Sequence, residues 1–363
     1  MSLQLLPPHS WTPGNPKPGI YLEVPERHYH QTGDLSVNAD SGISSSMAKK
    51  TDQEGTLSQY LLDSGTKTRS LDLGSALHLA VSQPKVFEKR VRLRDVQGAK
   101  QSNDYKRALI EFYEQSIPGI PRPECLNPKA PVPKLDKEGN PKLDKEGNPL
   151  FEKPEEPKVA DLSAHIEALE TAADSRGMIF LAPSEWSKLQ AMMQSVKTYP
   201  GDGIRRLLRG GMAESSIVAT CPETGLKLKC RPDFLEVRRG LIVDLKTSAN
   251  PYPGEFGREV SKWGYHFSAA WYAYVCKLAG IKINQFAFLV IGNEAPHDVA
   301  LYTMDKATQY DGEIRVRYAL DQIAHYYANP KTVHKGINPV GFQEVSAPWW
   351  SLTNETKAVF GQE

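Results

Sequence analysis

The sequence predicts an α/β (α+β) chain, and two patterns carry this prediction. Several long segments place apolar residues three and four positions apart, which is the spacing of one face of an α-helix. Several shorter segments are apolar runs that end at proline, glycine or charged turn residues, as buried β-strands do. With 363 residues, 40% of them hydrophobic and 24% charged, the chain has the composition of an ordinary globular protein of one large domain or two.

Helices are expected before and after the strands along the sequence. Leu73, Leu77 and Val81 form one apolar stripe. Pro183-Ser184 is a strong start signal, because proline favours the first helical position. The expected helices are 47–64, which is only weakly patterned, 71–82, 161–171, 183–198, 261–278 and 312–327. We expect helix 261–278 to bury a stripe that begins at Trp263.

Two pairs of strands are expected between residues 216 and 246. The turn Pro222-Glu223-Thr224-Gly225 joins the first pair, and Arg238-Arg239-Gly240 joins the second. Because both connections are short, we expect an antiparallel meander. The expected strands are 216–219, 226–231, 234–237 and 241–246, followed by a further apolar strand over 285–291.

The segment 121–158 differs from the rest of the chain. It is rich in proline and charge, and it contains PKLDKEGN twice in tandem, at 133–140 and 141–148. Such a segment buries little apolar surface, so we expect an insertion with a turn in each repeat. The expected organisation is a flexible leader over 1–17, one domain over 18–330 that carries this insertion, and a tail over 331–363. The tail holds Trp349-Trp350, which we expect to dock on a core or a subunit interface.

A short stretch near the middle of the chain carries the chemistry. Alternate residues of a strand share a face, so Asp244 and Lys246 are expected to point the same way. A bend at Pro232 would bring Asp233 alongside them. Two carboxylates that converge can bind a hard divalent cation, and a lysine beside that cation can orient water. The alternative is an ordinary ion pair on a solvated sheet edge.

Pro232-Asp233 and Asp244-Leu245-Lys246 resemble the core motif of the PD-(D/E)XK nucleases. More narrowly, the chain resembles the RecE-type exonucleases (exonuclease VIII) of the RecB-like group, because further pieces occur in the same order between about residues 18 and 325. These pieces are Pro18-Gly19-Ile20-Tyr21, Tyr29-His30, Ile43-Ser44-Ser45-Ser46, Gly74-Ser75-Ala76-Leu77-His78 with Gln83-Pro84, Glu214-Ser215-Ser216, Tyr265-His266-Phe267-Ser268-Ala269-Ala270-Trp271-Tyr272 and Glu294-Ala295-Pro296-His297-Asp298-Val299.

The resemblance implies a central mixed sheet flanked by helices, with Mg²⁺ at the strand pair and Mn²⁺ as an expected substitute. Asp233 and Asp244 would hold the metal, and the backbone carbonyl of Leu245 is a candidate ligand. His78 matches a histidine at the family's metal site. Taken alone, a histidine beside an apolar stripe is more often a packed or surface residue.

Two further side chains have expected roles in the same site. Lys246 would orient or activate the attacking water. Glu214 is a candidate for binding a second metal or for supporting the first. The sequence leaves open whether one metal or two are bound.

The helix after Lys246 departs from the family pattern at one position. The pattern Tyr-His-X-Gln reads Tyr265-His266-Phe267-Ser268 here, so a shorter side chain stands at the glutamine position. Tyr265, Ser268 and Tyr272 share one helical face, which could look into the site. The alternative is that they are ordinary half-buried residues. Ser268 therefore bears on catalytic strength or substrate choice.

The net charge of only +1 argues mildly against an extended DNA-binding surface. Two local clusters of basic residues could still contact phosphates, although both could equally be solvated faces. The clusters are Arg205, Arg206 and Arg209, and Lys227, Lys229, Arg231, Arg238 and Arg239.

Other features of the sequence bound its cellular setting. The four cysteines lack a CxxC pair, which argues against a zinc or iron–sulfur site and suits a reducing cytoplasm. No apolar run approaches the ~20 residues of a membrane span. Residues 1–14 lack the pattern of a signal peptide. We therefore expect a cytoplasmic protein with no membrane partner. The resemblance to the RecE-type exonucleases implies that a bacterium or a phage encodes it.

Metal-dependent hydrolysis of DNA is the function that these residues favour. The resemblance implies processive 5′→3′ digestion of linear duplex DNA, a homo-oligomeric ring, and a RecT-like single-strand annealing protein as a partner in recombination. One alternative is a single-strand or flap nuclease of the same fold in repair or defence. Another is a non-catalytic DNA-binding protein that retains the fold.

Overall fold

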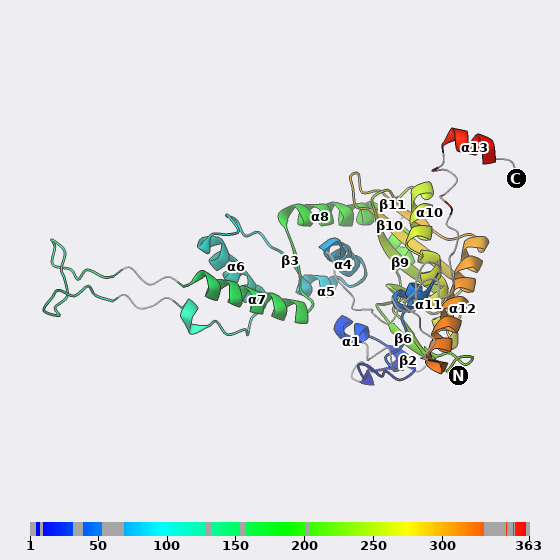
Figure 1. Cartoon of the computed structure of the whole chain (residues 1–363), viewed down its shortest axis with the longest axis horizontal. Coiled ribbons are helices and arrows are strands. Elements are labelled where there is room, and N and C mark those ends of the chain that lie inside the picture. The colour runs from blue at the N-terminus through cyan, green and yellow to red at the C-terminus, as the bar shows by residue number, and fades with distance from the viewer. Residues whose placement is uncertain are drawn as a thin grey trace.

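The computed structural model describes residues 5–7, 10–31, 39–52, 69–127, 132–152, 157–200, 203–329, 346, 351 and 353–360. A body of sheets and helices lies at one end of the molecule, and a pair of helices carrying a long arm extends from it (Figure 1). The body contains the candidate site, so its strands come first.

A five-stranded sheet forms the centre of the body. Its order is β11 (Val299–Tyr302), β10 (Gln285–Gly292), β9 (Leu241–Ser248), β8 (Phe234–Glu236) and β5 (Met212–Ala213). The central pair, β9 and β10, is parallel, and the other pairs are antiparallel. The sheet is therefore mixed, as expected.

Helices cover both faces of this sheet, because the side chains of β9 alternate. Val243 and Leu245 pack with α4 (Arg69–Ser82) and α8 (Pro183–Thr198). Ile242 packs in the other core, with α11 (Tyr265–Leu278) and α12 (Lys306–Ala328). The predicted fold class, a mixed sheet flanked by helices, is confirmed (Figure 1).

The predicted four-stranded meander is wrong in one respect. The hairpin of β6 (Ser216–Thr220) and β7 (Lys227–Cys230) belongs to a second sheet, of order β1-β2-β6-β7. Its other strands are β1 (Leu5–Leu6) and β2 (Gly19–Tyr21). β2 pairs with β6 and β5 pairs with β8, so each hairpin finds a different neighbour. Pro232 separates the hairpins and offers no N–H to continue a ladder.

The N-terminal segments pack against this second sheet. Trp11 is buried, with its ring 5.1 Å from that of Tyr21, so this part of the predicted leader contacts the body. Three short helices follow, namely α1 (Glu26–His30), α2 (Ser45–Ala48) and the 3₁₀ turn η2 (Lys49–Thr51). Of the weak helix predicted over 47–64, residues 53–64 lie outside the described residues, as does Trp349-Trp350.

The single helix predicted over 261–278 is wrong. The chain forms α10 (Pro253–Lys262) and α11, and Gly264 separates them with φ 60°, in the left-handed region. A Cβ atom on Gly264 would lie 3.0 Å from Cδ of Lys49, so a larger residue would crowd this lysine. The break turns Trp263 outward, and its side chain is 53% exposed instead of joining the buried stripe.

The extension from the body is built on two helices, α6 (Asn103–Ser116) and α7 (Val159–Ser175), with a small core of their own. Leu109, Tyr113, Leu162 and Leu169 are buried in that core. The sequence predicted α7 but not α6. The connecting elements are α5 (Pro84–Arg90), β3 (Val91–Leu93), η3 (Glu124–Leu126) and β4 (Ile179–Leu181), with β3 and β4 paired in parallel.

The tandem repeats form the arm at the far end of this extension (Figure 1). Asp136 and Asp144 each accept two backbone N–H bonds within their own repeat, which confirms the predicted turns. Three backbone bonds of 2.7 Å then close a cycle: Lys134 N–H to Leu150, Lys142 N–H to Lys134, and Leu150 N–H to Lys142. The two repeats and Pro149-Leu150-Phe151 thus contribute equivalent residues to this cycle of bonds.

Two elements remain, α9 (Gly203–Leu207) before the central sheet and α13 (Asn354–Phe360) near the C-terminus. Within the described ranges, no helix is both long enough and apolar enough to cross a membrane.

Candidate active site

Three carboxylates lie side by side across neighbouring strands of the central sheet. Ala213 of β5 pairs with Phe234 of β8, and Phe234 pairs with Val243 of β9. Continuing both registers by one residue sets Glu214, Asp233 and Asp244 in one row. The N–H of Glu214 donates to the carbonyl of Asp233 at 3.1 Å, which fixes the first two members of the row.

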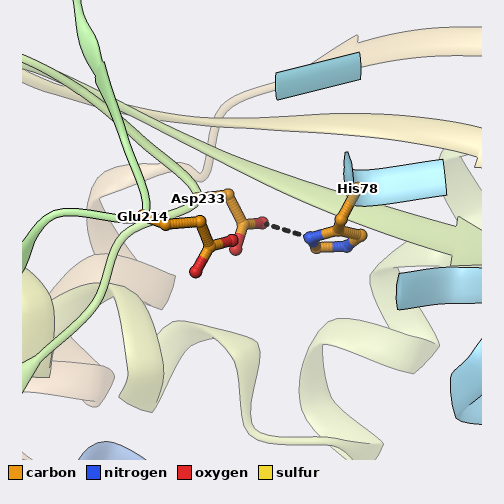
Figure 2. Close-up of side chains that lie close together, drawn as sticks. All are labelled: His78, Glu214 and Asp233. Carbon is orange, nitrogen blue, oxygen red and sulfur yellow. Dashed lines mark ion pairs between the residues drawn. The ribbon is translucent and has the colours of Figure 1, made fainter. Parts of the chain in front are cut away.

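His78 of α4 points at Asp233, and Glu214 lies beside that carboxylate (Figure 2). The candidate ligand atoms of His78, Glu214 and Asp233 all lie within 4.8 Å of one another. Three separate elements therefore meet at one point. Two carboxylates and an imidazole are ligands that Mg²⁺, Mn²⁺ and other divalent cations accept, so the donor set fits a divalent metal.

Asp233 is held ionised at the centre of this group. Burial opposes its charge, but His78, Lys246 and the Leu245 N–H outweigh burial and hold the pKa of Asp233 below its usual value. The His78 Nδ1 atom lies 3.4 Å from Asp233 Oδ2. Burial also opposes the charge of His78, and the neighbouring Asp233 carboxylate overcomes it and raises the pKa of His78.

Glu214, in contrast to Asp233, favours its protonated form. Burial, and then the negative charge of Asp233, raise its pKa to about 7. Its backbone lies in the left-handed region with φ 49°, which is uncommon for a residue with a side chain and often marks a functional position. Arg231 Nε lies 4.0 Å from the Glu214 carboxylate.

Asp244 and Lys246 form an ion pair on the other side of Asp233. They are alternate residues of β9, and Lys246 Nζ contacts Asp244 Oδ2. Asp244 is only 4% exposed. Burial and the Asp233 charge raise its pKa, against the pull of Lys246. Both carboxylates in turn outweigh burial and raise the pKa of Lys246, which therefore stays a cation. Asp244 is thus engaged by Lys246 and stands beside the group of three.

The sequence of this region matches a known protein family. Residues 153–333 match the family described as a PDDEXK-like domain of unknown function (DUF3799). This match supports a nuclease of the PD-(D/E)XK superfamily, whose members are generally dependent on divalent metals. The matched range includes Glu214, Asp233, Asp244 and Lys246, whereas His78 precedes it.

Solved structures of low sequence identity accompany this match. A candidate exonuclease from Eubacterium rectale is 11% identical, with a TM-score of 0.45 over 90% of this chain and 97% of the other. A phage-related exonuclease from Haemophilus somnus 129PT is 15% identical, with a TM-score of 0.22 over 39% of this chain and 70% of the other. No curated protein matches the sequence.

Helix α11, which lies within the matched range, supplies the residues predicted to support the site. The ring of Tyr265 lies 4.9 Å from Lys246 Nζ. Burial, with the charges of Asp244 and Asp233 among the further causes, raises the pKa of Tyr272 well above its usual value, so its hydroxyl stays protonated. Ser268 accepts a hydrogen bond of 3.0 Å from Ser45 Oγ of α2, a contact that links α11 to the N-terminal segment.

The predicted DNA-binding arginines fall in two environments. Arg205, Arg206 and Arg209 are exposed in and just after α9. Arg231 lies inside the domain, where its guanidinium stacks 4.5 Å from the ring of Tyr29 and donates to Ser216 Oγ at 3.0 Å. This arginine therefore adjoins Glu214 at the floor of the site.

Lys49 of η2 is a site residue that the sequence analysis missed. Its Nζ donates to the carbonyl of Trp263 at 3.0 Å. Burial, and then the charge of Lys246 on β9, lower the pKa of Lys49 to about 8. The only signal in the sequence is Lys49-Lys50 directly after the Ser44-Ser45-Ser46 motif, which does not distinguish a site lysine from a surface one.

Proposed function

We propose that this protein is a divalent-metal-dependent deoxyribonuclease that acts as an exonuclease on linear duplex DNA. The observation that carries the proposal is the meeting of His78, Glu214 and Asp233 beside the Asp244–Lys246 pair. Hydrolysis of a phosphodiester needs charge stabilisation at the phosphate and a positioned water. This group of side chains offers ligands for the first task and a cation for the second.

Asp233, Glu214 and His78 would hold the metal, and Asp244 would join them once Lys246 releases it. The ion, proposed as Mg²⁺ with Mn²⁺ as a substitute, would polarise the phosphate and stabilise the leaving oxygen. Lys246 would hold the attacking water by hydrogen bonding, and Tyr265 would keep the lysine over the site. The Leu245 carbonyl is retained as a proposed ligand.

A RecE-type exonuclease is the finer assignment that we propose. It is supported by the order of motifs from Pro18-Gly19 to Asp298-Val299. This assignment implies 5′→3′ digestion that leaves single strands for recombination. It also implies a homo-oligomer and a RecT-like annealing partner. The exposed arginines of α9 are proposed to contact DNA phosphates. The four cysteines are free, which suits the proposed bacterial or phage-encoded protein of a reducing cytoplasm.

The test is digestion of a linear duplex labelled at either 5′ or 3′ ends, with Mg²⁺ or with EDTA. The wild-type protein should release label first from the 5′ ends, only with Mg²⁺, and Asp244→Ala should release none. Asp104→Ala is the matched control, because Asp104 is an exposed carboxylate of α6, and it should digest DNA normally.

Two other outcomes would change the assignment. Cleavage restricted to single strands, flaps or closed circles would replace the exonuclease with another nuclease of the same fold. Intact DNA binding without cleavage of any substrate would leave a non-catalytic DNA-binding protein.

A further inference from the structure

Trp263 presents an exposed indole beside the proposed site. Tryptophan is one of the more buried residue types on average, yet the Trp263 side chain is 53% exposed. The Lys262 ammonium lies 4.7 Å from the centre of its ring. The left-handed Gly264 that follows turns the indole away from the core of α11.

The backbone of Trp263 is anchored on both sides. Its N–H donates to the Glu259 carbonyl at 2.9 Å, and its carbonyl accepts from Lys49 Nζ at 3.0 Å. The Glu259 carboxylate in turn accepts a 2.7 Å bond from Ser248 Oγ at the end of β9. Hydrogen bonds therefore link the backbone of Trp263 to Lys49 and, through Glu259, to the strand that carries Lys246.

A line of contacts leads from Trp263 to the catalytic strand. Lys49 packs against Gly264, the next residue is Tyr265, and the Tyr265 ring lies 4.9 Å from Lys246 Nζ. The lowered pKa of Lys49 agrees with this closeness, because Lys246 contributes to it. The Trp263 carbonyl uses one of the three N–H donors of the Lys49 ammonium.

We propose that Trp263 and Lys49 form a nucleotide-binding position at the edge of the site. The indole stacks on a base of the substrate strand, and the Lys49 ammonium contacts a neighbouring backbone phosphate. This inference rests on the proposed function, and it adds that the enzyme grips an unpaired base next to the bond that it cuts.

A nucleotide suits this surface better than another protein chain does. Positive charges from Lys262 and Lys49 accompany Trp263, and a nucleotide offers both a flat aromatic face and a negative phosphate. Stacking of bases on exposed aromatic residues together with lysine contacts to phosphates is the usual chemistry of single-strand binding. An apolar protein partner would offer no negative group to Lys49 and Lys262.

The test measures binding of a fluorescent duplex with an oligothymidine overhang, in EDTA so that DNA stays intact. A second set of probes carries one abasic position, moved stepwise along the overhang. Trp263→Ala should weaken binding of the intact overhang about tenfold. At one position the abasic site should weaken wild-type binding by a similar factor, and Trp263→Ala should then add little. Trp263→Phe should retain most of the affinity.

Lys49→Met tests the phosphate contact. It should weaken binding of all probes alike, with or without the base, and reduce the salt dependence by about one counterion. Lys49→Arg should preserve binding. The matched controls are Tyr310→Ala and Lys306→Met, which alter an exposed tyrosine and an exposed lysine of α12 and should bind every probe as the wild type does. A thermal melt of each variant verifies folding.

Three outcomes overturn the inference. In the first, Trp263→Ala binds every probe as the wild type does. In the second, Trp263→Ala loses the same affinity for the intact and the abasic probes. In the third, Trp263→Ala changes the mass of the protein in light scattering, which would make this face a contact between copies. If the wild type digests DNA while one of these holds, the proposed function stands and the nucleotide position falls. If base-dependent binding through Trp263 is found without digestion, the position stands and the nuclease falls.

Discussion

Asp233 Oδ2 accepts a hydrogen bond of 2.6 Å from the backbone N–H of Leu245. The bond crosses from the residue before β8 to strand β9, so one carboxylate serves two purposes. The Asp233 carboxylate joins two strands, and its charge is available to a metal bound with His78 and Glu214. The purposes can be separated by mutation.

Asp233→Asn should fold and fail to cut. The amide oxygen can still accept the Leu245 N–H, whereas the negative charge is lost. We expect a lower unfolding free energy than that of the wild type, because the charge paired with His78 and Lys246 is lost. Metal binding, measured by calorimetry, and DNA digestion should both be lost. Asp233→Ala, which loses the acceptor as well, should be less stable than Asp233→Asn by about 1–3 kcal/mol. Equal stability of the two variants would show that the bond to Leu245 contributes little.

Lys246→Met should lose digestion while keeping DNA binding. The lysine is proposed to hold the attacking water, and loss of such a group lowers rates by about 10²-fold or more. Single-turnover digestion with Mg²⁺ measures the rate, and anisotropy in EDTA measures binding. Retained digestion in Lys246→Met would remove this lysine from the proposed mechanism.

Glu214 predicts a pH dependence of stability in the metal-free protein. Its pKa rises from 4.5 to about 7 on folding, so the folded state keeps a proton that the unfolded chain loses. Stability should therefore fall as the pH rises from about 5 to above 7. The raised pKa of His78 acts in the same direction, because its stabilising charge is lost as the pH rises through that value.

Thermal melts of wild type and Glu214→Gln in EDTA, at intervals from pH 5 to pH 8, check this dependence. The glutamine variant should show a smaller decline with pH. Mg²⁺ should restore the wild type most strongly at pH 8, because the cation competes with the proton for Glu214. Parallel declines in the two proteins would contradict the role given to Glu214.

Ser268→Ala should affect stability more than catalysis. Ser268 accepts from Ser45 and so ties α11 to α2. Loss of this bond should lower the unfolding free energy by about 1 kcal/mol. Digestion at a temperature well below the melting midpoint should be unchanged. A large loss of rate in a stable Ser268→Ala protein would instead place the hydroxyl in the catalytic machinery.

Replacement of residues 132–152 by a short Gly/Ser linker should leave the domain stable and active. The arm's backbone bonds close on one another through Lys134, Lys142 and Leu150, and its tip lies far from the site (Figure 1). Melting temperature and digestion of a short duplex should match those of the full chain. A slower rate on this substrate would show that the arm contacts DNA.

Local patterns predicted the elements whose residues decide their own structure. Helix α8 begins at Pro183 and ends at Thr198 as expected, and β9 alternates so that Asp244 and Lys246 meet on one face. These features depend on proline geometry and on the two-residue period of a strand, both of which are local.

The features that the sequence did not predict are set by distant neighbours. Trp263 fits a buried helical stripe on its own segment, but Gly264 takes the left-handed conformation and separates two helices there, with Lys49 of a distant segment packed against it. The two hairpins separate because β2 and β5 take their free edges. The meeting of His78 and Glu214 at Asp233 likewise depends on strand register and helix placement, which local periodicity does not specify.

The grouping of His78, Glu214 and Asp233 has a consequence for the stage of folding at which the proposed nuclease activity arises. His78 and Asp233 lie far apart in the sequence, and the helix-and-arm extension is made between them. The group can therefore assemble only after the later strands have formed and α4 has packed on them. An unfinished or half-folded chain holds the ligands apart, so the ability to cut DNA would arise as one of the last steps of maturation.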